Sequence, residues 1–198
     1  MPDDSDSVAQ IQAALDRGDA DGARALAREA YARDPSDGKV RELYVPLHLA
    51  QAIRLAAEAR EARRRDIARR RIPYDEDFED TPEVARAFEA ALEAHEAILR
   101  ADPGNEKVLM MKAVLLFRKD REKGRTEALG ILRAIRDSRP ENRQVAFAIR
   151  KVERPCERCS DTGFCPRCAG RGFRSLLRIE RACDACHGQG ICPVCGIL

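Results

Sequence analysis

The sequence predicts a mainly α-helical fold that ends in a small cysteine-rich module. The chain is rich in Ala, Leu, Arg and Glu and poor in aromatic residues (5%, with no Trp), which favours helix over strand. Apolar residues recur at helical spacing over residues 8–152. All eight cysteines follow this region. We therefore expect a disordered tail over residues 1–7, a helical domain over 8–153 and a cysteine module over 154–198.

Two amphipathic stripes begin the helical domain. The first contains Val8, Ile11 and Leu15, and the second contains Ala23, Leu26, Ala27, Ala30 and Tyr31. Asp34-Pro35 closes the second helix, because proline rarely continues a helix. Residues 38–71 predict one long helix that is kinked at Pro46.

Basic residues gather at the end of this long helix, and an acidic loop follows them. The arginines are Arg60, Arg63, Arg64, Arg65, Arg69, Arg70 and Arg71, and the acids are Asp75, Glu76, Asp77, Glu79 and Asp80. We interpret them as a solvated helix end whose cations suit the helix dipole. The alternative is a phosphate-binding patch, but no interleaved aromatic residues or known motif support it.

Four more helices are predicted beyond this loop. Thr81-Pro82-Glu83 is a good helix start, with a capping hydroxyl, a proline and an acid in the first turn. That helix ends at Asp102-Pro103-Gly104. The next helices carry apolar stripes around residues 108–117, 128–135 and 145–152, and the second of them stops before Pro140.

The helix-ending prolines have a nearly regular spacing. Pro35 and Pro103 lie 68 residues apart, and Pro103 and Pro140 lie 37 apart. In this period, and in Gly18-Asp19 and Asp34-Pro35, the helical domain resembles tetratricopeptide repeats. The resemblance implies antiparallel helix pairs with a groove for a protein partner. Most of the family's large aromatic residues are missing, and a generic helical bundle is the alternative.

The cysteine module repeats one short motif. Each copy is C-x-x-C, a glycine-containing loop and an apolar residue, and the copies begin at Cys156, Cys165, Cys183 and Cys192. A shift of 27 residues maps the first two copies onto the last two, so the module is a duplicated two-turn unit. Two thiolates at this spacing grip one ion from a tight turn, and Zn²⁺ takes four such ligands. The sequence therefore predicts two zinc ions in closed, structural Cys₄ sites.

This motif resembles the cysteine-rich zinc domain of DnaJ-type co-chaperones over residues 156–196. In that family the first and fourth turns share one zinc ion, and the second and third share the other. The resemblance implies one site of Cys156, Cys159, Cys192 and Cys195 and another of Cys165, Cys168, Cys183 and Cys186. The alternative is one zinc within each half. The loops of five residues within the halves make that arrangement tight, so we favour the crossed pairing.

The chain also departs from the DnaJ pattern. None of its histidines, His48, His95 and His187, precedes the Pro-Asp of a J-domain loop, and Asp161 replaces an inner glycine. The compact turn spacing is more similar to zinc-finger proteins that lack a J-domain. Residues 172–182, with Phe173, Leu176, Leu177 and Ile179, predict a hairpin between the halves. We expect its apolar residues to pack on the helical domain, and a client-binding edge is the alternative.

Three other functions use the same cysteines. A thiol–disulfide oxidoreductase would use C-x-x-C pairs, but such a pair usually stands alone at a helix N-terminus in a βαβ fold. RNA or DNA binding is not favoured, because eight thiolates and two Zn²⁺ lower the formal net charge from +2 to about −2. A c-type haem would use Cys183, Cys186 and His187, but three sibling turns lack the histidine.

These observations predict a non-enzymatic, chaperone-like or adaptor protein. Its partner is expected to be a protein or a non-native client. The N-terminus is acidic and polar, unlike a signal peptide, and no stretch approaches the roughly 20 apolar residues of a membrane span. We therefore expect a cytoplasmic protein that does not enter a membrane.

Overall fold

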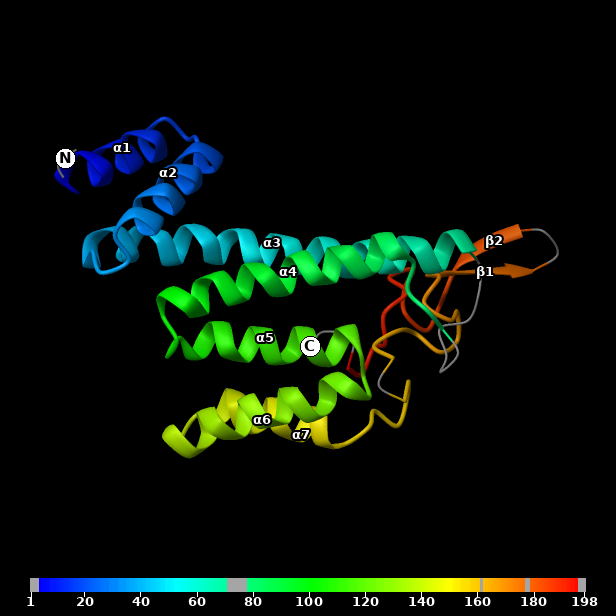
Figure 1. The fold of residues 1–198 in the computed structure, drawn as a ribbon. Coiled ribbons are helices and arrows are strands. Elements are labelled where there is room, and N and C mark those ends of the chain that lie inside the picture. Colours follow the sequence, from blue (N-terminus) through cyan, green and yellow to red (C-terminus); the bar gives the residue numbers. More distant parts are fainter. Residues whose placement is uncertain (1–3, 71–77, 161, 177–178, 196–198) are drawn as a thin grey trace.

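A computed structural model describes residues 4–70, 78–160, 162–176 and 179–195 (Figure 1). The mainly helical fold predicted from the sequence is confirmed. The helices are α1 (Asp4–Asp16), α2 (Ala20–Arg33), α3 (Gly38–Arg70), α4 (Pro82–Ala101), α5 (Glu106–Lys119), α6 (Lys123–Ser138) and α7 (Arg143–Glu153). The strands β1 (Phe173–Leu176) and β2 (Ile179–Ala182) form an antiparallel hairpin.

Some predicted features lie outside the described residues. They are residues 1–3 of the tail, Arg71, the acidic residues Asp75, Glu76 and Asp77, Asp161, Leu177 and Gly196. The prediction of a disordered tail over residues 1–7 is wrong for its second part. Residues 4–7 belong to α1. They extend the helix by about one turn before the first apolar residue of its stripe, where the hydrophobic pattern carries no signal.

The helix ends are where the proline pattern placed them. α2, α4 and α6 end at Arg33, Ala101 and Ser138, two residues before prolines 35, 103 and 140. The predicted cap of α4 is also present, since the Thr81 side chain accepts a hydrogen bond from the Val84 amide. The long helix predicted for residues 38–71 is α3, which has Pro46 inside it.

Consecutive helices pack against each other from α1 to α7. α3 has 33 residues, about twice the 14 of α2 and of α5, and it connects two regions of the molecule (Figure 1). Its first half packs with α1 and α2 through Val40 and Tyr44, and its second half packs with α4 through Ala59. The likeness to tetratricopeptide repeats stays a prediction, because this helix interrupts the regular pairing.

Arg63 corrects our interpretation of the basic end of α3 as a solvated surface. Its side chain is only 4% exposed and lies over the ring of Phe88. Nε donates a 2.8 Å hydrogen bond to Asp80, and the two terminal nitrogens donate to the carbonyls of Arg118 and Lys119. A residue from α3 therefore satisfies carbonyl groups that the end of α5 leaves without helical partners.

No helix in the described residues has the length and apolarity of a membrane span.

Two histidines are buried within the helical domain. His95 in α4 is 0% exposed; its Nδ1 lies 2.7 Å from the carbonyl oxygen of Ala91, and its Nε2 makes no hydrogen bond within the described residues. Burial lowers the pKa of His95, and it also lowers the pKa of His48 in α3. Both rings therefore bind protons more weakly in the folded than in the unfolded protein.

We predict that His95→Leu reduces the acid sensitivity of the helical domain. The folded pKa is depressed, so unfolding takes up a proton as pH falls below the ordinary histidine value of about 6.5, and stability is lost there. The fall in Tm between about pH 7 and about pH 5, followed by circular dichroism, should be smaller than in the wild type. His187→Asn, which changes an exposed turn residue, is the control. An equal fall in Tm for His95→Leu and the control would contradict the prediction.

Candidate metal centre

Three of the four cysteine turns share one backbone conformation within the described residues. The residue that follows the second cysteine has a left-handed conformation in three of the turns, with φ near 50° at Ser160, Ala169 and His187. The glycine three positions later also has a positive φ, at Gly163, Gly172 and Gly190. Positive φ values favour glycine, because a residue with a side chain is strained in this conformation. His187 lies exposed in its turn.

The glycines direct backbone amides toward sulfur. The amide of Gly172 donates a 3.3 Å hydrogen bond to Cys168 Sγ, and the amide of Gly190 donates a 3.2 Å bond to Cys186 Sγ. Both glycines lie four residues after the cysteine that they contact. Such hydrogen bonds stabilise a thiolate and orient it toward a metal. The spacing of glycine after C-x-x-C therefore has a direct chemical reason.

The two duplicated halves pair with each other reciprocally. The amide of Cys165 donates to the carbonyl of Gly190, and the amide of Cys192 donates to the carbonyl of Gly163, both at 2.9 Å. Phe164 and Ile191 form an antiparallel bridge between these bonds. The shift of 27 residues maps one of these hydrogen bonds onto the other, since it takes Cys165 to Cys192 and Gly163 to Gly190. The two duplicated halves are thus related by a pseudo-two-fold axis in the structure.

Backbone contact at this axis requires glycine. A methyl group on Gly190 would lie 2.3 Å from the carbonyl oxygen of Gly170, and one on Gly172 would lie 2.4 Å from that of Gly188. Both distances are shorter than a van der Waals contact, so the loops meet backbone to backbone. This close approach brings the second C-x-x-C turn next to the third.

The cysteine sulfurs gather in two separate groups. One contains Cys156, Cys159, Cys192 and Cys195, and the other contains Cys165, Cys168, Cys183 and Cys186. Within each group all sulfurs lie within 4.8 Å of one another. This grouping is the crossed one, with sulfurs from both halves in each group. Each group could hold one zinc ion.

The spacing of the sulfurs fits zinc. A regular tetrahedron with Zn–S bonds near 2.3 Å places neighbouring sulfurs about 3.8 Å apart. Sulfurs facing each other across the halves are 4.0 Å and 3.2 Å apart in the first group, for Cys156–Cys192 and Cys159–Cys195. In the second group the equivalent distances are 4.0 Å and 3.7 Å. A disulfide would need about 2.05 Å.

The pKa values of the thiols also indicate that each sulfur group needs a cation. Burial raises the pKa of Cys168 to about 12, and it raises the pKa of Cys195 as well. Burial acts the same way on Cys156, but hydrogen bonds from the amides of Arg158 and Cys159 outweigh it and lower that pKa to about 7. Four thiolates therefore do not coexist in either group without a positive charge among them, and Zn²⁺ supplies it.

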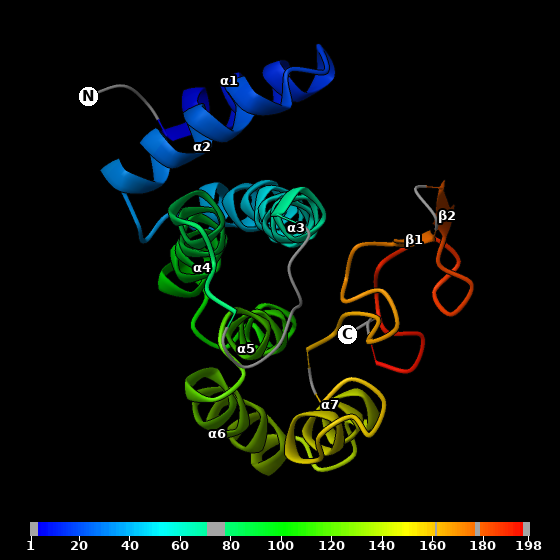
Figure 2. The ribbon, with the colours of Figure 1, turned by 90° about the vertical axis from the view of Figure 1, so that its right-hand side faces the viewer.

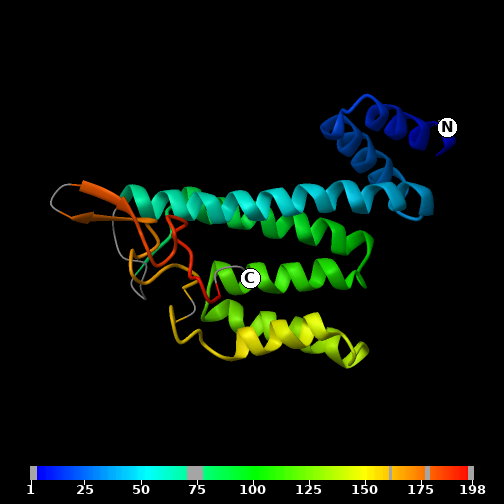
Figure 3. The same ribbon diagram turned by 180° about the vertical axis from the view of Figure 1, so that it is seen from behind.

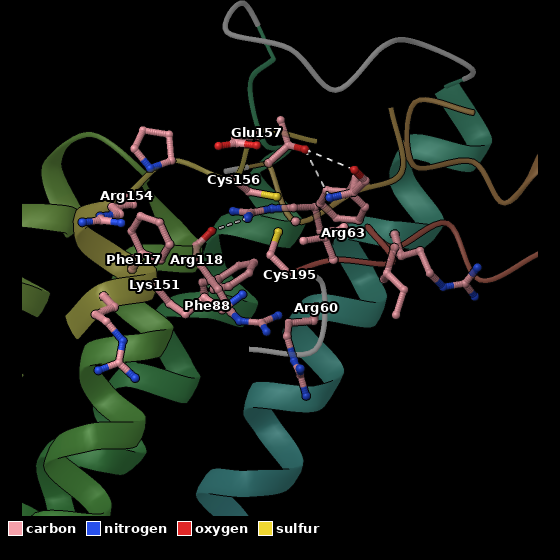
Figure 4. A pocket seen from close by; sticks show the side chains of 18 of the residues that line it. Arg60, Arg63, Phe88, Phe117, Arg118, Lys151, Arg154, Cys156, Glu157 and Cys195 are labelled. Atoms are coloured by element: carbon pink, nitrogen blue, oxygen red, sulfur yellow. Dashed lines mark hydrogen bonds between the residues drawn. The ribbon is translucent and has the colours of Figure 1, made fainter. Parts of the chain in front are cut away.

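The two groups have different surroundings. All four cysteines of the second group are buried, whereas Cys156 and Cys195 of the first are partly exposed. The first group faces the helices across a cavity of about 540 Å³, which both exposed cysteines line (Figure 4). We therefore expect the first group to release its metal more readily than the second.

Two contacts dock the module on the helical domain. Ile67 at the end of α3 is fully buried, and a methyl group on Gly170 would lie 3.2 Å from its Cγ2. Arg121 Nη1, between α5 and α6, donates a 2.8 Å hydrogen bond to the carbonyl of Ser160. Neither residue was identified from the sequence, since nothing in their local pattern distinguishes them from other apolar or basic residues.

The hairpin corrects one sequence-based expectation. β1 and β2 pair as predicted, with Phe173 opposite Ala182 and Arg174 opposite Arg181. Ile179, however, is 56% exposed and does not pack on the helices. Figures 1 and 3 show the hairpin extending away from the helices at one end of the molecule. The hairpin begins and ends at the second and third C-x-x-C turns. These turns hold its base, and its strands extend into solvent.

Comparison with known proteins finds no match to this chain among protein-family models, curated proteins or solved structures.

We predict that Cys159→Ser removes one zinc ion and leaves the helical domain folded. The first group loses a thiolate, while the second keeps its own four sulfurs. Elemental analysis should give about one zinc per chain instead of two. The helical circular dichroism signal should persist, with a lower Tm because the first group, which faces the helices across a cavity, no longer holds its metal.

Ala185→Ser is the matched control, because it places serine in a C-x-x-C loop without removing a thiol. It should keep both zinc ions. Loss of the helical signal in Cys159→Ser would contradict the division into a helical domain and a separately stabilised module.

Proposed function

We propose that this protein is a non-enzymatic zinc protein that binds another protein, as an adaptor or as a chaperone-like factor for non-native chains. The single observation that carries this proposal is an apolar groove on the helical domain. A cavity of about 610 Å³ is lined by side chains of α3, α5 and α7 and by His95 of α4. Figure 2 shows these three helices in an arc beside the zinc module.

The groove is apolar and accessible. Met110, Met111 and Val114 of α5 line it, and Ile53 of α3 and Phe147 of α7 lie on either side of them. Ile53 is 45% exposed and Phe147 is 48% exposed, so two large apolar side chains contact water. Contiguous apolar surface of this kind marks interaction sites, and methionine adapts to varied partners. Phe147 lies off the buried face formed by Val145, Ile149 and Val152.

The chemistry of the sulfur groups supports a structural role for the metal. Four sulfur ligands complete the coordination of a zinc ion, so no coordination position remains for water or substrate. A redox role as a thiol–disulfide oxidoreductase is less well supported, because a thiolate held by zinc is not free to attack a disulfide. The relation of the module to DnaJ-type zinc domains is part of this proposal and rests on the four C-x-x-C turns and on their crossed grouping.

The proposal is tested with a permanently unfolded model protein that has been reduced and alkylated with a neutral group. The zinc-loaded chain should bind it, and Phe147→Ser should weaken binding by roughly tenfold, equivalent to about 1.4 kcal/mol. Isothermal titration measures both. Because Phe147 is half exposed, the substitution should leave the helical Tm nearly unchanged.

Ile179→Ser on the hairpin is the matched control, since it removes another exposed apolar side chain. If Ile179→Ser weakens binding and Phe147→Ser does not, the groove is not the binding surface. No binding by the zinc-loaded chain, together with turnover in an insulin-reduction assay, would replace the proposal with the oxidoreductase.

A further inference from the structure

The apolar groove continues into a basic cavity at the zinc module. The two cavities, of about 610 Å³ and about 540 Å³, share Arg60, Arg118 and Phe147 in their linings. Arg60 comes from α3, Arg118 from the last turn of α5, and Phe147 from α7. The two cavities therefore adjoin at these three side chains, and we refer to them together as the channel, which reaches from the methionines of α5 to the first sulfur group.

Arg118 lies at the junction of these cavities. It forms no ion pair with a carboxylate in the described part of the chain, and Arg60, Arg63 and Cys195 lie near enough to interact with its charge. Figure 4 shows Arg118 beside Cys195 in the cavity. A partly buried guanidinium group next to two others is stabilised by an anion between them.

The rest of the lining adds to this positive charge. Arg150, Lys151 and Arg154, at the end of α7, line the cavity and form no ion pair within the described residues. Lys151 Nζ lies 5.5 Å from the ring centre of Phe147, so cationic and apolar surfaces meet there. Of the two acids in the lining, Glu61 already pairs with Arg64 at 2.6 Å, and Glu157 is exposed.

The charge of a zinc ion with its four thiolates does not cancel the positive charge of the cavity lining. A zinc ion with four thiolates carries a charge of about −2. The lining contains seven cations, of which Arg63 and Arg64 pair with Asp80 and Glu61. The five cations that have no carboxylate partner among the described residues therefore outweigh both the first zinc group and Glu157.

We propose that this channel binds an acidic segment of a partner protein, with carboxylates against Arg118, Lys151 and Arg154 and apolar side chains against Met110, Met111 and Phe147. The proposal rests on the proposed function and names the chemistry of the partner. Opposite charges at one end fix the direction of the segment, and apolar contacts at the other supply affinity.

A peptide fits these observations better than a nucleic acid does. The whole chain has a formal net charge of about −2 once thiolates and zinc are counted, so its cations form no broad phosphate-binding face. The cations gather around a cavity that adjoins an apolar one. An extended chain with acidic and apolar side chains matches both parts, whereas a phosphate backbone matches only the first.

The experiment uses the zinc-loaded full chain and a fluorescein-labelled peptide in which leucines and a phenylalanine precede a run of glutamates. Fluorescence anisotropy should show binding that weakens as salt rises. A peptide with glutamines in place of the glutamates should bind at least roughly tenfold more weakly. The double variant Lys151→Glu and Arg154→Glu should show a similar loss for the acidic peptide and little change for the glutamine peptide.

Lys39→Glu with Arg41→Glu is the matched control, because it makes the same charge change at the far end of α3. Zinc content and circular dichroism confirm that the variants are folded, and Arg118→Gln gives a second, uncharged test. Equal binding of both peptides, or no effect of the variants at the cavity, overturns the acidic-segment proposal. In those cases binding of the unfolded model protein through Phe147 would still stand.

Two further outcomes would also overturn the proposal. Single-stranded RNA of similar length that binds more tightly than the acidic peptide and displaces it would assign the cations to nucleic acid. Binding of citrate without any binding of the peptide would reduce the site to a pocket for small anions.

Discussion

The meeting of sulfur atoms from turns far apart in the sequence is the constraint on which the C-terminal module depends. The module has few buried residues besides cysteine, so apolar burial alone gives it little stability. Reciprocal hydrogen bonds and glycine contacts bring the halves together, and each sulfur group has the size of a zinc tetrathiolate. Because each group takes sulfur from both halves, metal at either one cross-links the duplicated units.

The helical domain gives this module a fixed place. Ile67 and Arg121 hold it against the ends of α3 and α5, and Arg63 connects those two helices beneath it. The first sulfur group then forms a wall of the channel that the helices begin. In the proposed function, zinc therefore has two effects: it stabilises the module, and it completes a surface on which a partner binds. The more exposed sulfur group is the one that contributes to this surface.

Much of the local structure could be predicted from the sequence, and most long-range contacts could not. Prolines 35, 103 and 140 and Thr81 predict helix boundaries because their effects are local. The C-x-x-C spacing predicts metal ligands for the same reason. In the sequence, Arg63 and Arg118 both look like ordinary surface arginines, and only packing separates their roles: Arg63 bonds the end of α5, and Arg118 faces a cavity. The exposure of Ile179 likewise depends on where the hairpin points.

The most direct test of the account is a thiol map of the intact protein during stepwise metal release. A limiting amount of chelator yields chains with one zinc ion, and these are pulse-alkylated, separated by native mass spectrometry and mapped by peptide analysis. The account predicts that Cys156 and Cys159 are labelled together with Cys192 and Cys195, while Cys165, Cys168, Cys183 and Cys186 stay protected. Labelling of Cys156 and Cys159 together with Cys165 and Cys168, with the last four cysteines protected, would contradict it.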